Sequence, residues 1–409
     1  MLLRGLSKRI RNKTLRFTNS KKHKMIDTVC LLIPKDKLTP LELSARGVPT
    51  WSLHSKTDQY EKYVKNPSKR DLDSGLYFPR LTGYNRKGFA QEANVRIEFS
   101  APKLLYLNNL DELEEKDFPK VVDTLQDRLT AMGIAVPKKV LQNASVSSIH
   151  FSKNIQLEDG YTVTHLISEM NKVNLRKSFD FAKTRFMNDG QSLYAHTTTH
   201  QLVIYDKVAD LGKDKKRAID KEQPPYQQSL FAELSKDSEL SEVLRFEVRL
   251  SHKQKMNKVL EDLGYAKNPS FKQVFNAELS RKIVTSYWQK VIKERGLGLF
   301  SISVSIKDML RTLFLADKKL KPRQAIYLLG LFMLAKDENG MRQLRTILSK
   351  RSHDRTWYRI AKDTQRASEL ITKNKIRNWV TQIDKSLDEF RAYKHKKLST
   401  DEQLECKAV

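Results

Sequence analysis

Two segments of this chain have the clearest side-chain pattern of β-strands, Gln201–Lys207 and Val243–Leu250. The second of these constrains the fold most. Val243–Leu250 alternates apolar residues with Arg245, Glu247 and Arg249. Successive side chains of a strand point to opposite faces of a sheet, so its apolar residues should pack on a core and its charged residues should face solvent. The other segment, Gln201–Lys207, is rich in β-branched and aromatic residues between polar turns. We therefore expect a sheet with one charged face.

The rest of the chain mixes strands and helices before about residue 254 and shows only helices after it. Alternating or short apolar runs predict strands at Ile26–Ile33, Leu76–Phe78, Val95–Phe99 and Ser145–Phe151. Apolar residues at helical spacing predict helices at Asp117–Met132, Thr162–Val173, Lys307–Leu315, Ala325–Leu334, Met341–Leu348, Arg355–Ile371 and Lys375–Tyr393. This order predicts an α+β fold, an antiparallel sheet with helices on one side, followed by an all-helical domain. Ala325–Leu334 is apolar on nearly every face and should be the buried helix of that domain.

The charge balance of the chain favours an anionic partner. Its 409 residues include 76 Lys and Arg against 48 Asp and Glu, which gives a formal net charge of +28. Nucleic acid is the leading candidate, because neutralising phosphates releases counterions, and an acidic membrane surface is the weaker alternative. No apolar run approaches the roughly 18 residues of a membrane span. Cys30 and Cys406 lack metal-ligand spacing, so we expect a reducing, cytoplasmic setting and no zinc module.

Three parts are expected along the chain. Residues 1–24 are rich in Lys and Arg and contain no acid. They form a basic arm, an upstream extension before a start at Met25, or a transit peptide, and we favour the first two. Residues 25–265 would form the α+β domain and residues 266–409 the helical domain. A charged stretch, Lys207–Ser238, follows the strand at Gln201–Lys207. It is expected to be a long loop, and its length marks it as mobile or functional.

Three of the expected strands carry a reactive side chain, namely His150, Tyr205 and Glu247. In a basic protein this set predicts phosphodiester chemistry, because a tyrosine hydroxyl can attack phosphorus and release a 3′ hydroxyl. A protonated tyrosine, with a pKa of about 10, is a poor nucleophile and needs help. Glu247 and His150 are ligand types for Mg²⁺ or Mn²⁺, which would polarise the phosphate. Lys207 would share a strand face with Tyr205 and favour the phenolate or hold the phosphate, although a solvated lysine that opens the loop is the simpler interpretation.

Other side chains are weaker candidates. His196 and His200 flank a threonine-rich bend and could bind a metal or move a proton, but solvated turn histidines are commoner. Between Leu344 and Arg366, a short helix, a polar turn and a basic helix resemble a helix-turn-helix. That arrangement would present the basic residues of its second helix to DNA: Arg355, Arg359, Lys362 and Arg366.

Together these motifs resemble the gene II/X-type rolling-circle replication initiators of filamentous phages and related plasmids. The likeness lies in Ser192–Tyr194, Ile204–Lys207, Leu244–Arg249, Met25–Asp27, Phe99–Leu105 and Ser148–His150. It covers residues 25–265 well and the helical remainder only loosely. The chain departs from the pattern at His150, where the phage-type relatives carry an acid. It also lacks the paired histidines of many related nickases.

The resemblance implies a nicking and joining domain in residues 25–265 and a helical domain in residues 266–409 that helps to recognise origin DNA. Tyr205 would cut one strand and stay joined to the 5′ phosphate, and the free 3′ hydroxyl would prime synthesis by host polymerase and helicase. The displaced strand would later be rejoined. Glu247 would be a metal ligand, and the protein would work in the cytoplasm of a bacterial host.

Two alternatives from other classes remain. The first is a non-catalytic DNA-binding regulator of phage or plasmid replication, against which the presence of Tyr205 and Glu247 speaks. The second is a general single-strand binder, which would need aromatic residues interleaved with basic ones to stack on the bases. The sequence shows no such platform.

Overall fold

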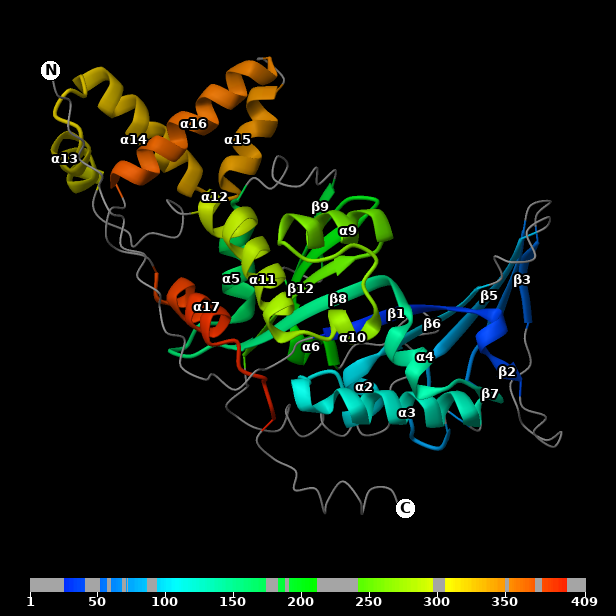
Figure 1. Cartoon of the computed structure of the whole chain (residues 1–409). Coiled ribbons are helices and arrows are strands. Elements are labelled where there is room, and N and C mark those ends of the chain that lie inside the picture. Colours follow the sequence, from blue (N-terminus) through cyan, green and yellow to red (C-terminus); the bar gives the residue numbers. More distant parts are fainter. Residues whose placement is uncertain are drawn as a thin grey trace, which may run out of the picture.

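The protein is an α+β molecule built on a ten-stranded antiparallel sheet (Figure 1). The computed structural model describes residues 26–40, 52–56, 60–67, 71, 73–86, 94–173, 183–187, 191–211, 242–296, 306–349, 353–371 and 377–395. The strands of the sheet follow the order β3-β4-β5-β6-β1-β8-β12-β11-β10-β9. The α+β class and the large antiparallel sheet predicted from the sequence are confirmed.

The strands differ greatly in length. The two longest, β8 and β1, lie side by side at the centre of the sheet. Their bounds are β1 Ile26–Pro34, β3 Ser52–Lys56, β4 Tyr60–Lys65, β5 Arg80–Arg86, β6 Asn94–Ser100, β8 Ser145–Gln156, β9 Lys183–Met187, β10 Ser192–His196, β11 His200–Asp206 and β12 Val243–Leu250. A separate two-stranded sheet pairs β2 (Thr39–Pro40) with β7 (Ile134–Ala135).

Helices occur between the strands and make up the chain after β12. Within the first part they are η1 Lys35–Lys37, α2 Ala101–Tyr106, η3 Glu115–Asp117, α3 Phe118–Ala131, α4 Lys138–Asn143, α5 Val163–Asn171 and α6 Lys207–Leu211. After β12 they are α9 Lys253–Asp262, α10 Phe271–Val274, α11 Ala277–Tyr287, the π-helix η4 Trp288–Lys293, α12 Glu294–Gly296, α13 Ile306–Ala316, α14 Pro322–Lys336, α15 Gly340–Ser349, α16 Asp354–Ile371 and α17 Asn378–Glu389.

One face of the central strands belongs to the main hydrophobic core. The apolar side chains of β8, β11 and β12 on this face are fully buried and include Phe151, Ile204 and Phe246. They share this core with residues of α5, α9, α11 and α17, all of which contact the central strands. Trp288 of η4 packs edge to face on both Phe246 and Trp379, so it joins α17 to the sheet. Burying three large aromatic rings in this way adds to the apolar area that stabilises the arrangement.

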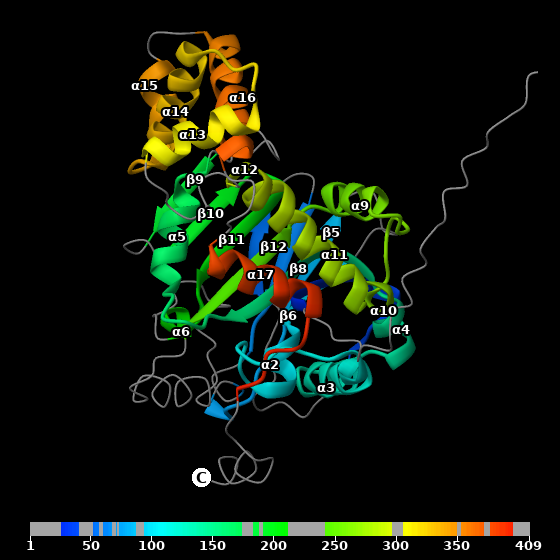
Figure 2. The same ribbon diagram turned by 90° about the vertical axis from the view of Figure 1, so that its left-hand side faces the viewer.

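The helices beyond residue 265 divide between two cores. Helices α11, η4 and α17 pack with the sheet, whereas α13, α14 and α16 form a second core around Leu313, Leu328 and Phe332. Figure 2 shows this second group, with α15, standing together at one end of the molecule beyond α12. The boundary predicted at residue 265 stays a prediction, because helices on its far side belong to both groups.

Several predictions about single elements need correction. Leu76–Phe78 is not a strand: Tyr77 and Phe78 are buried, and the ladder starts only at Arg80. Their apolar character reflects burial in the core rather than strand pairing. Helix α14 is not buried all round, since Ile326 and Leu334 are more than half exposed. Residues 1–24 and most of the predicted charged loop, 212–241, lie outside the described residues. Within the described part of the chain, no helix is long and apolar enough to cross a membrane.

Candidate active site

The charged face of the sheet is organised by the register of β12 with its two neighbours. Opposite residues of antiparallel strands point to the same face, and Glu247 lies opposite Val203 of β11 and Ser152 of β8. Two residues along, Arg245 lies opposite Tyr205. Tyr205 and Glu247 are therefore diagonal neighbours on one face, although 42 residues separate them along the chain. His150 reaches Glu247 along the other diagonal, because it pairs with Arg249.

A β-bulge adds Asp27 to this face. In the pairing of β1 with β8, Ile26 lies opposite Phe151 and Val29 lies opposite Ile149. Three steps along β1 therefore match two along β8, so one extra residue is accommodated between the pairs. Ile26 and Val29 both remain in the apolar core, and the bulge allows Asp27 to turn toward His150. The residue is 7% exposed.

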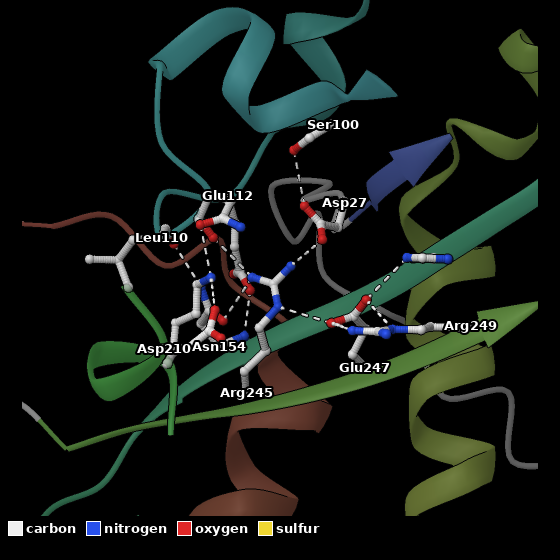
Figure 3. Close-up of polar contacts among 12 residues, drawn as sticks. Asp27, Ser100, Leu110, Glu112, Asn154, Asp210, Arg245, Glu247 and Arg249 are labelled. Carbon is white, nitrogen blue, oxygen red and sulfur yellow. Dashed lines mark hydrogen bonds and ion pairs between the residues drawn. The ribbon is translucent and has the colours of Figure 1, made fainter. Parts of the chain in front are cut away.

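Asp27, His150 and Glu247 together form a cluster of ligand types. Figure 3 shows Asp27 and Glu247 with the arginines around them. One ligand atom of each lies within 4.8 Å of the others. His150 Nδ1 is 3.2 Å from Glu247 Oε1. Among the described residues this is the one such cluster of three or more potential ligands. His150 and Glu247 were both expected from the sequence, and Asp27 was not.

Two arginines balance the charge of this cluster. Arg249 Nε donates to Glu247 Oε1 at 2.9 Å, and its Nη2 donates to Oε2 at 3.3 Å. Arg245 Nη2 lies 3.0 Å from Asp27 Oδ2, and its Nε lies 3.6 Å from Glu247 Oε2. Ser100 Oγ also donates to Asp27 Oδ1 at 3.2 Å. The expectation of a solvated charged face is therefore wrong, because Arg245 and Glu247 are each 1% exposed.

The environment shifts the pKa of the carboxyl and the phenol in opposite directions. Burial alone would raise the pKa of Glu247, but Arg249, His150 and Arg245 together hold it well below its ordinary value. Glu247 is thus a carboxylate at neutral pH. Burial raises the pKa of Tyr205 well above its ordinary value of 10.0, and Arg245 opposes this only in part. Tyr205 is therefore a neutral phenol, whose hydroxyl donates to Glu247 Oε2 at 3.3 Å.

Lys207 is not the solvated lysine of the simpler interpretation. It is the first residue of α6, it is fully buried, and its ammonium lies over the ring of Tyr205, 5.7 Å from the centroid. Its Nζ donates to Asn109 Oδ1 at 2.8 Å and lies 3.6 Å from Asp210. A buried cation over the face of an aromatic ring is an electrostatically favourable arrangement. Lys207 thus packs against the tyrosine ring, and its role toward the phenolate or the phosphate stays a prediction.

A loop at 108–112 holds these cations in place. Asn109 accepts two hydrogen bonds. Its side-chain oxygen accepts from Lys207, and its backbone carbonyl accepts from Arg245 Nη1 at 3.0 Å. Arg245 Nη1 also donates to Asn154 Oδ1 at 3.2 Å. In the same loop, Glu112 accepts from Lys153 Nζ at 3.1 Å and from the backbone N–H of Asn154. The cluster is therefore a hydrogen-bonded network rather than separate ion pairs.

The donor set suits a divalent cation. Two carboxylates and an imidazole are ligands that Mn²⁺ accepts, and the carboxylate oxygens suit Mg²⁺ as well. A carboxylate offers about four lone-pair positions, and those of Glu247 already accept from several neighbours. An ion would therefore replace some of these contacts. Arg249 is the contact best able to move, because its side chain is 24% exposed against 1% for Arg245.

The remaining predicted site residues lie elsewhere. His196 and His200 are not members of the ligand cluster. His200 is 2% exposed, and its ring nitrogen Nδ1 is 2.9 Å from Thr197 Oγ1, so it stabilises the turn. Arg355, Arg359, Lys362 and Arg366 are all exposed on α16, and Arg366 forms an ion pair with Asp317 at 2.9 Å.

Sequence reasoning missed three members of the site. Asp27 depends on a bulge, which leaves no mark in the pattern of apolar residues. The position of Arg245 in the sequence did indicate a role. A charged residue two positions from Glu247 on an alternating strand lies on the same face and has to be either solvated or paired. Asn109 lies in a loop, and nothing in its neighbourhood in the sequence connects it with Lys207. Comparison of the chain with protein-family models, with curated proteins and with solved structures finds no match.

Proposed function

We propose that this protein is a metal-dependent DNA nicking and joining enzyme that initiates rolling-circle replication. The observation that carries the proposal is the contact of the Tyr205 hydroxyl with Glu247 at 3.3 Å, inside a cluster that includes Asp27 and His150. A nucleophile of this reaction needs a hydroxyl, a proton acceptor and a cation site within reach of one phosphate. The resemblance of residues 25–265 to the gene II/X-type initiators supports the same assignment.

In the proposed reaction, Tyr205 Oη attacks the scissile phosphorus. The new Oη–P bond replaces the bond from phosphorus to the 3′ oxygen, so the 5′ phosphate stays on the tyrosine. Tyr205 Oη gives up its proton, finally to solvent, and the 3′ oxygen takes up a proton from solvent and leaves as a hydroxyl, so the protons balance. Attack of a 3′ hydroxyl on the phosphotyrosine reverses these steps and rejoins the strand.

The charged residues around Tyr205 have separate tasks. A divalent ion held by Asp27, His150 and Glu247 would polarise the phosphate and stabilise charge on the leaving oxygen. Arg245 remains buried beside the phenol and opposes the rise of its pKa, so it favours loss of the proton during attack. Arg249, which is partly exposed, exchanges its contact with Glu247 for a phosphate oxygen of the DNA, because guanidinium groups bind phosphates in two-pronged geometry.

The helical part of the chain provides affinity for origin DNA in this proposal. The exposed Arg355, Arg359 and Lys362 of α16 would contact the backbone, in a helical DNA-binding domain that follows an α+β nicking domain. The exposed 3′ hydroxyl would then be extended by the polymerase and helicase of a bacterial host, whose cytoplasm is the expected location.

The test is the formation of a covalent adduct. Wild-type protein is incubated with end-labelled single-stranded or supercoiled origin DNA and Mg²⁺ or Mn²⁺, and the product is separated in denaturant. We expect labelled DNA attached to the protein in a metal-dependent reaction, and no adduct with Tyr205→Phe. Tyr194→Phe is the matched control, because Tyr194 lies on the same face of the sheet, opposite Val203. An adduct that persists in Tyr205→Phe, or that forms fully with chelator present, would contradict the assignment.

The burial of Tyr205 favours a second candidate function. Its side chain is 9% exposed, as expected of a structural tyrosine. A DNA-binding regulator without chemistry would keep the basic helices and use Tyr205 and Glu247 only to hold the sheet together. This candidate predicts specific binding of origin DNA by wild type and by Tyr205→Phe, with no adduct from either.

A further inference from the structure

A hollow of about 550 Å³ lies where α16 and α15 meet α12, away from the tyrosine site. Figure 2 shows α12 directly below the group formed by α13–α16. The volume falls within the roughly 300–1,000 Å³ of ligand pockets. The walls combine basic, aromatic and small side chains, among them Arg295, Arg345, Lys362, Trp357, Tyr358 and Ala361.

The charge of the hollow is positive. Three of its lining residues are cations, Arg295, Arg345 and Lys362, and no acidic residue of the described chain lines it. Arg345 has a carboxylate nearby, but that of Asp354 is 3.9 Å away and 81% exposed, so it compensates the guanidinium weakly. Burial lowers the pKa of Arg295, and Glu294 opposes this only in part. An anion bound here would oppose this effect on Arg295.

The same hollow offers aromatic surface. Trp357 forms a buried wall, and the guanidinium of Arg345 lies over its ring, 5.7 Å from the centroid. Tyr358 is 42% exposed. Ala361 leaves room beside the two rings. An aromatic ring next to cations is the arrangement that binds a base together with its phosphate.

We propose that this hollow binds one nucleotide of single-stranded DNA, with its phosphate on Arg345 and Arg295 and its base stacked on Tyr358. The proposal rests on the proposed function, for which it supplies a contact to the strand that nicking exposes. The sequence contains no run of interleaved aromatic and basic residues. The fold assembles such a surface from three helices that are up to about 70 residues apart along the chain.

The experiment measures binding without cleavage. Full-length protein in chelator is titrated into a fluorescein-labelled single-stranded oligonucleotide, and anisotropy gives the dissociation constant. We expect Tyr358→Ala to weaken binding about tenfold or more, since stacking of one base is worth that much. Arg345→Gln should weaken binding by a similar factor, since it removes a charged contact to the phosphate. Tyr358→Phe keeps the ring and should bind as wild type does. Tyr327→Ala is the matched control, because Tyr327 is similarly exposed, at 47%, on α14 and does not line the hollow. Equal affinity for Tyr358→Ala, Arg345→Gln and wild type would overturn the proposal.

Further measurements distinguish a DNA strand from a free nucleotide as the ligand. They also test the hollow separately from the nicking proposal. An oligonucleotide with 5-iododeoxyuridine should cross-link to the peptide that contains Trp357 and Tyr358, and a cross-link only elsewhere would overturn the proposal. Free deoxynucleoside monophosphate should compete weakly with the oligonucleotide. If the monophosphate binds and the oligonucleotide does not, the assignment to a DNA strand is overturned. Tyr205→Phe should bind the oligonucleotide as wild type does. Absence of an adduct from the wild-type protein, with binding in the hollow retained, would contradict the nicking proposal alone.

Discussion

Glu247 is almost completely buried, and its negative charge is balanced by side chains from two strands. Replacing it with glutamine would leave Arg249 without its carboxylate and Arg245 with Asp27 alone. Removing one partner of a buried ion pair costs about 3–5 kcal/mol of unfolding free energy, so we expect Glu247→Gln to lose stability of that order at neutral pH. Urea denaturation without metal measures it. Glu98→Gln is the control, because Glu98 contacts Arg96 at 3.4 Å in a half-exposed pair and its loss should cost under about 1 kcal/mol.

The lowered pKa of Glu247 also predicts how the free energy of unfolding depends on pH. The pKa of Glu247 is lower in the folded protein than the roughly 4.3 of an unfolded glutamate, so its contribution is fully present above that value. The contribution is lost as pH falls through the lower, folded-state pKa. We therefore expect a constant stability gap between wild type and Glu247→Gln from about pH 5.5 to pH 7, and a gap that narrows at more acid pH. A gap that widens on acidification would contradict the ion-pair network.

Asp27 allows the metal role to be tested separately from the nucleophile. Asp27→Asn keeps the size of the side chain and removes the charge. We expect the metal concentration needed for half-maximal adduct formation to rise at least about 10- to 100-fold, because altering even the residues that orient metal ligands has an effect of that size. Titration of Mn²⁺ in the adduct assay measures it. Asp36→Asn, an exposed aspartate of η1 nine residues further along, should leave the titration unchanged. An unchanged metal requirement in Asp27→Asn would remove Asp27 from the ligand set.

At the scale of elements, the segment after α17 holds the loop that supports the site. Glu112 and Tyr393 exchange two hydrogen bonds: the Glu112 N–H donates to the Tyr393 carbonyl at 2.9 Å, and the Tyr393 N–H donates to Glu112 Oε2 at 2.8 Å. The His395 N–H donates to Asp111 Oδ1 at 2.8 Å. Asn109 of this loop in turn holds Lys207 and Arg245. The C-terminal segment is thus connected to Tyr205 through a chain of polar contacts.

Truncation tests this connection. Deleting residues 390–409 removes the support of the loop, and we expect adduct formation to slow about tenfold or more, because small displacements of catalytic groups have large effects on rate. Deleting only residues 396–409 keeps Tyr393 and His395 and should leave the rate near that of wild type. Hydrogen exchange of residues 108–112 should rise in the longer deletion alone. Equal rates in the two truncated proteins would show that the segment does not position the site.

The sequence predicted elements better than it predicted how they meet. Period-two alternation was enough to place β6 and β12, because each has one apolar face. It failed at Leu76–Phe78, where Tyr77 is buried without strand pairing and accepts from the Ser100 N–H at 2.9 Å. His150, Tyr205 and Glu247 could be named as a set, but their distances follow from the strand order β8-β12-β11, which no local pattern encodes. Asp27 required a bulge, and the burial of Lys207 required a loop about 100 residues away.

At the scale of the whole molecule, the net charge of +28 has to be reconciled with a folded chain. Many cations of the sheet are paired, as Arg245, Arg249 and Lys153 are with carboxylates. Much of α16, in contrast, presents exposed basic side chains. Basic side chains of α16 are therefore available to phosphates, while these charges of the sheet are used internally. This division separates sequence-independent DNA affinity from the chemistry of the tyrosine site.

Salt dependence of DNA binding tests this division. If α16 contacts about as many phosphates as it has free basic residues, the logarithm of the binding constant should fall steeply and linearly with the logarithm of salt concentration. Replacing both Arg355 and Arg359 with glutamine should reduce the slope by about 2 and weaken binding equally for origin and unrelated duplexes, because phosphate contacts carry no sequence information. Arg391→Gln, at a side chain that is 75% exposed, should leave the slope unchanged. A loss confined to origin DNA would instead mean that α16 contacts bases, and an unchanged slope would place the DNA on another surface.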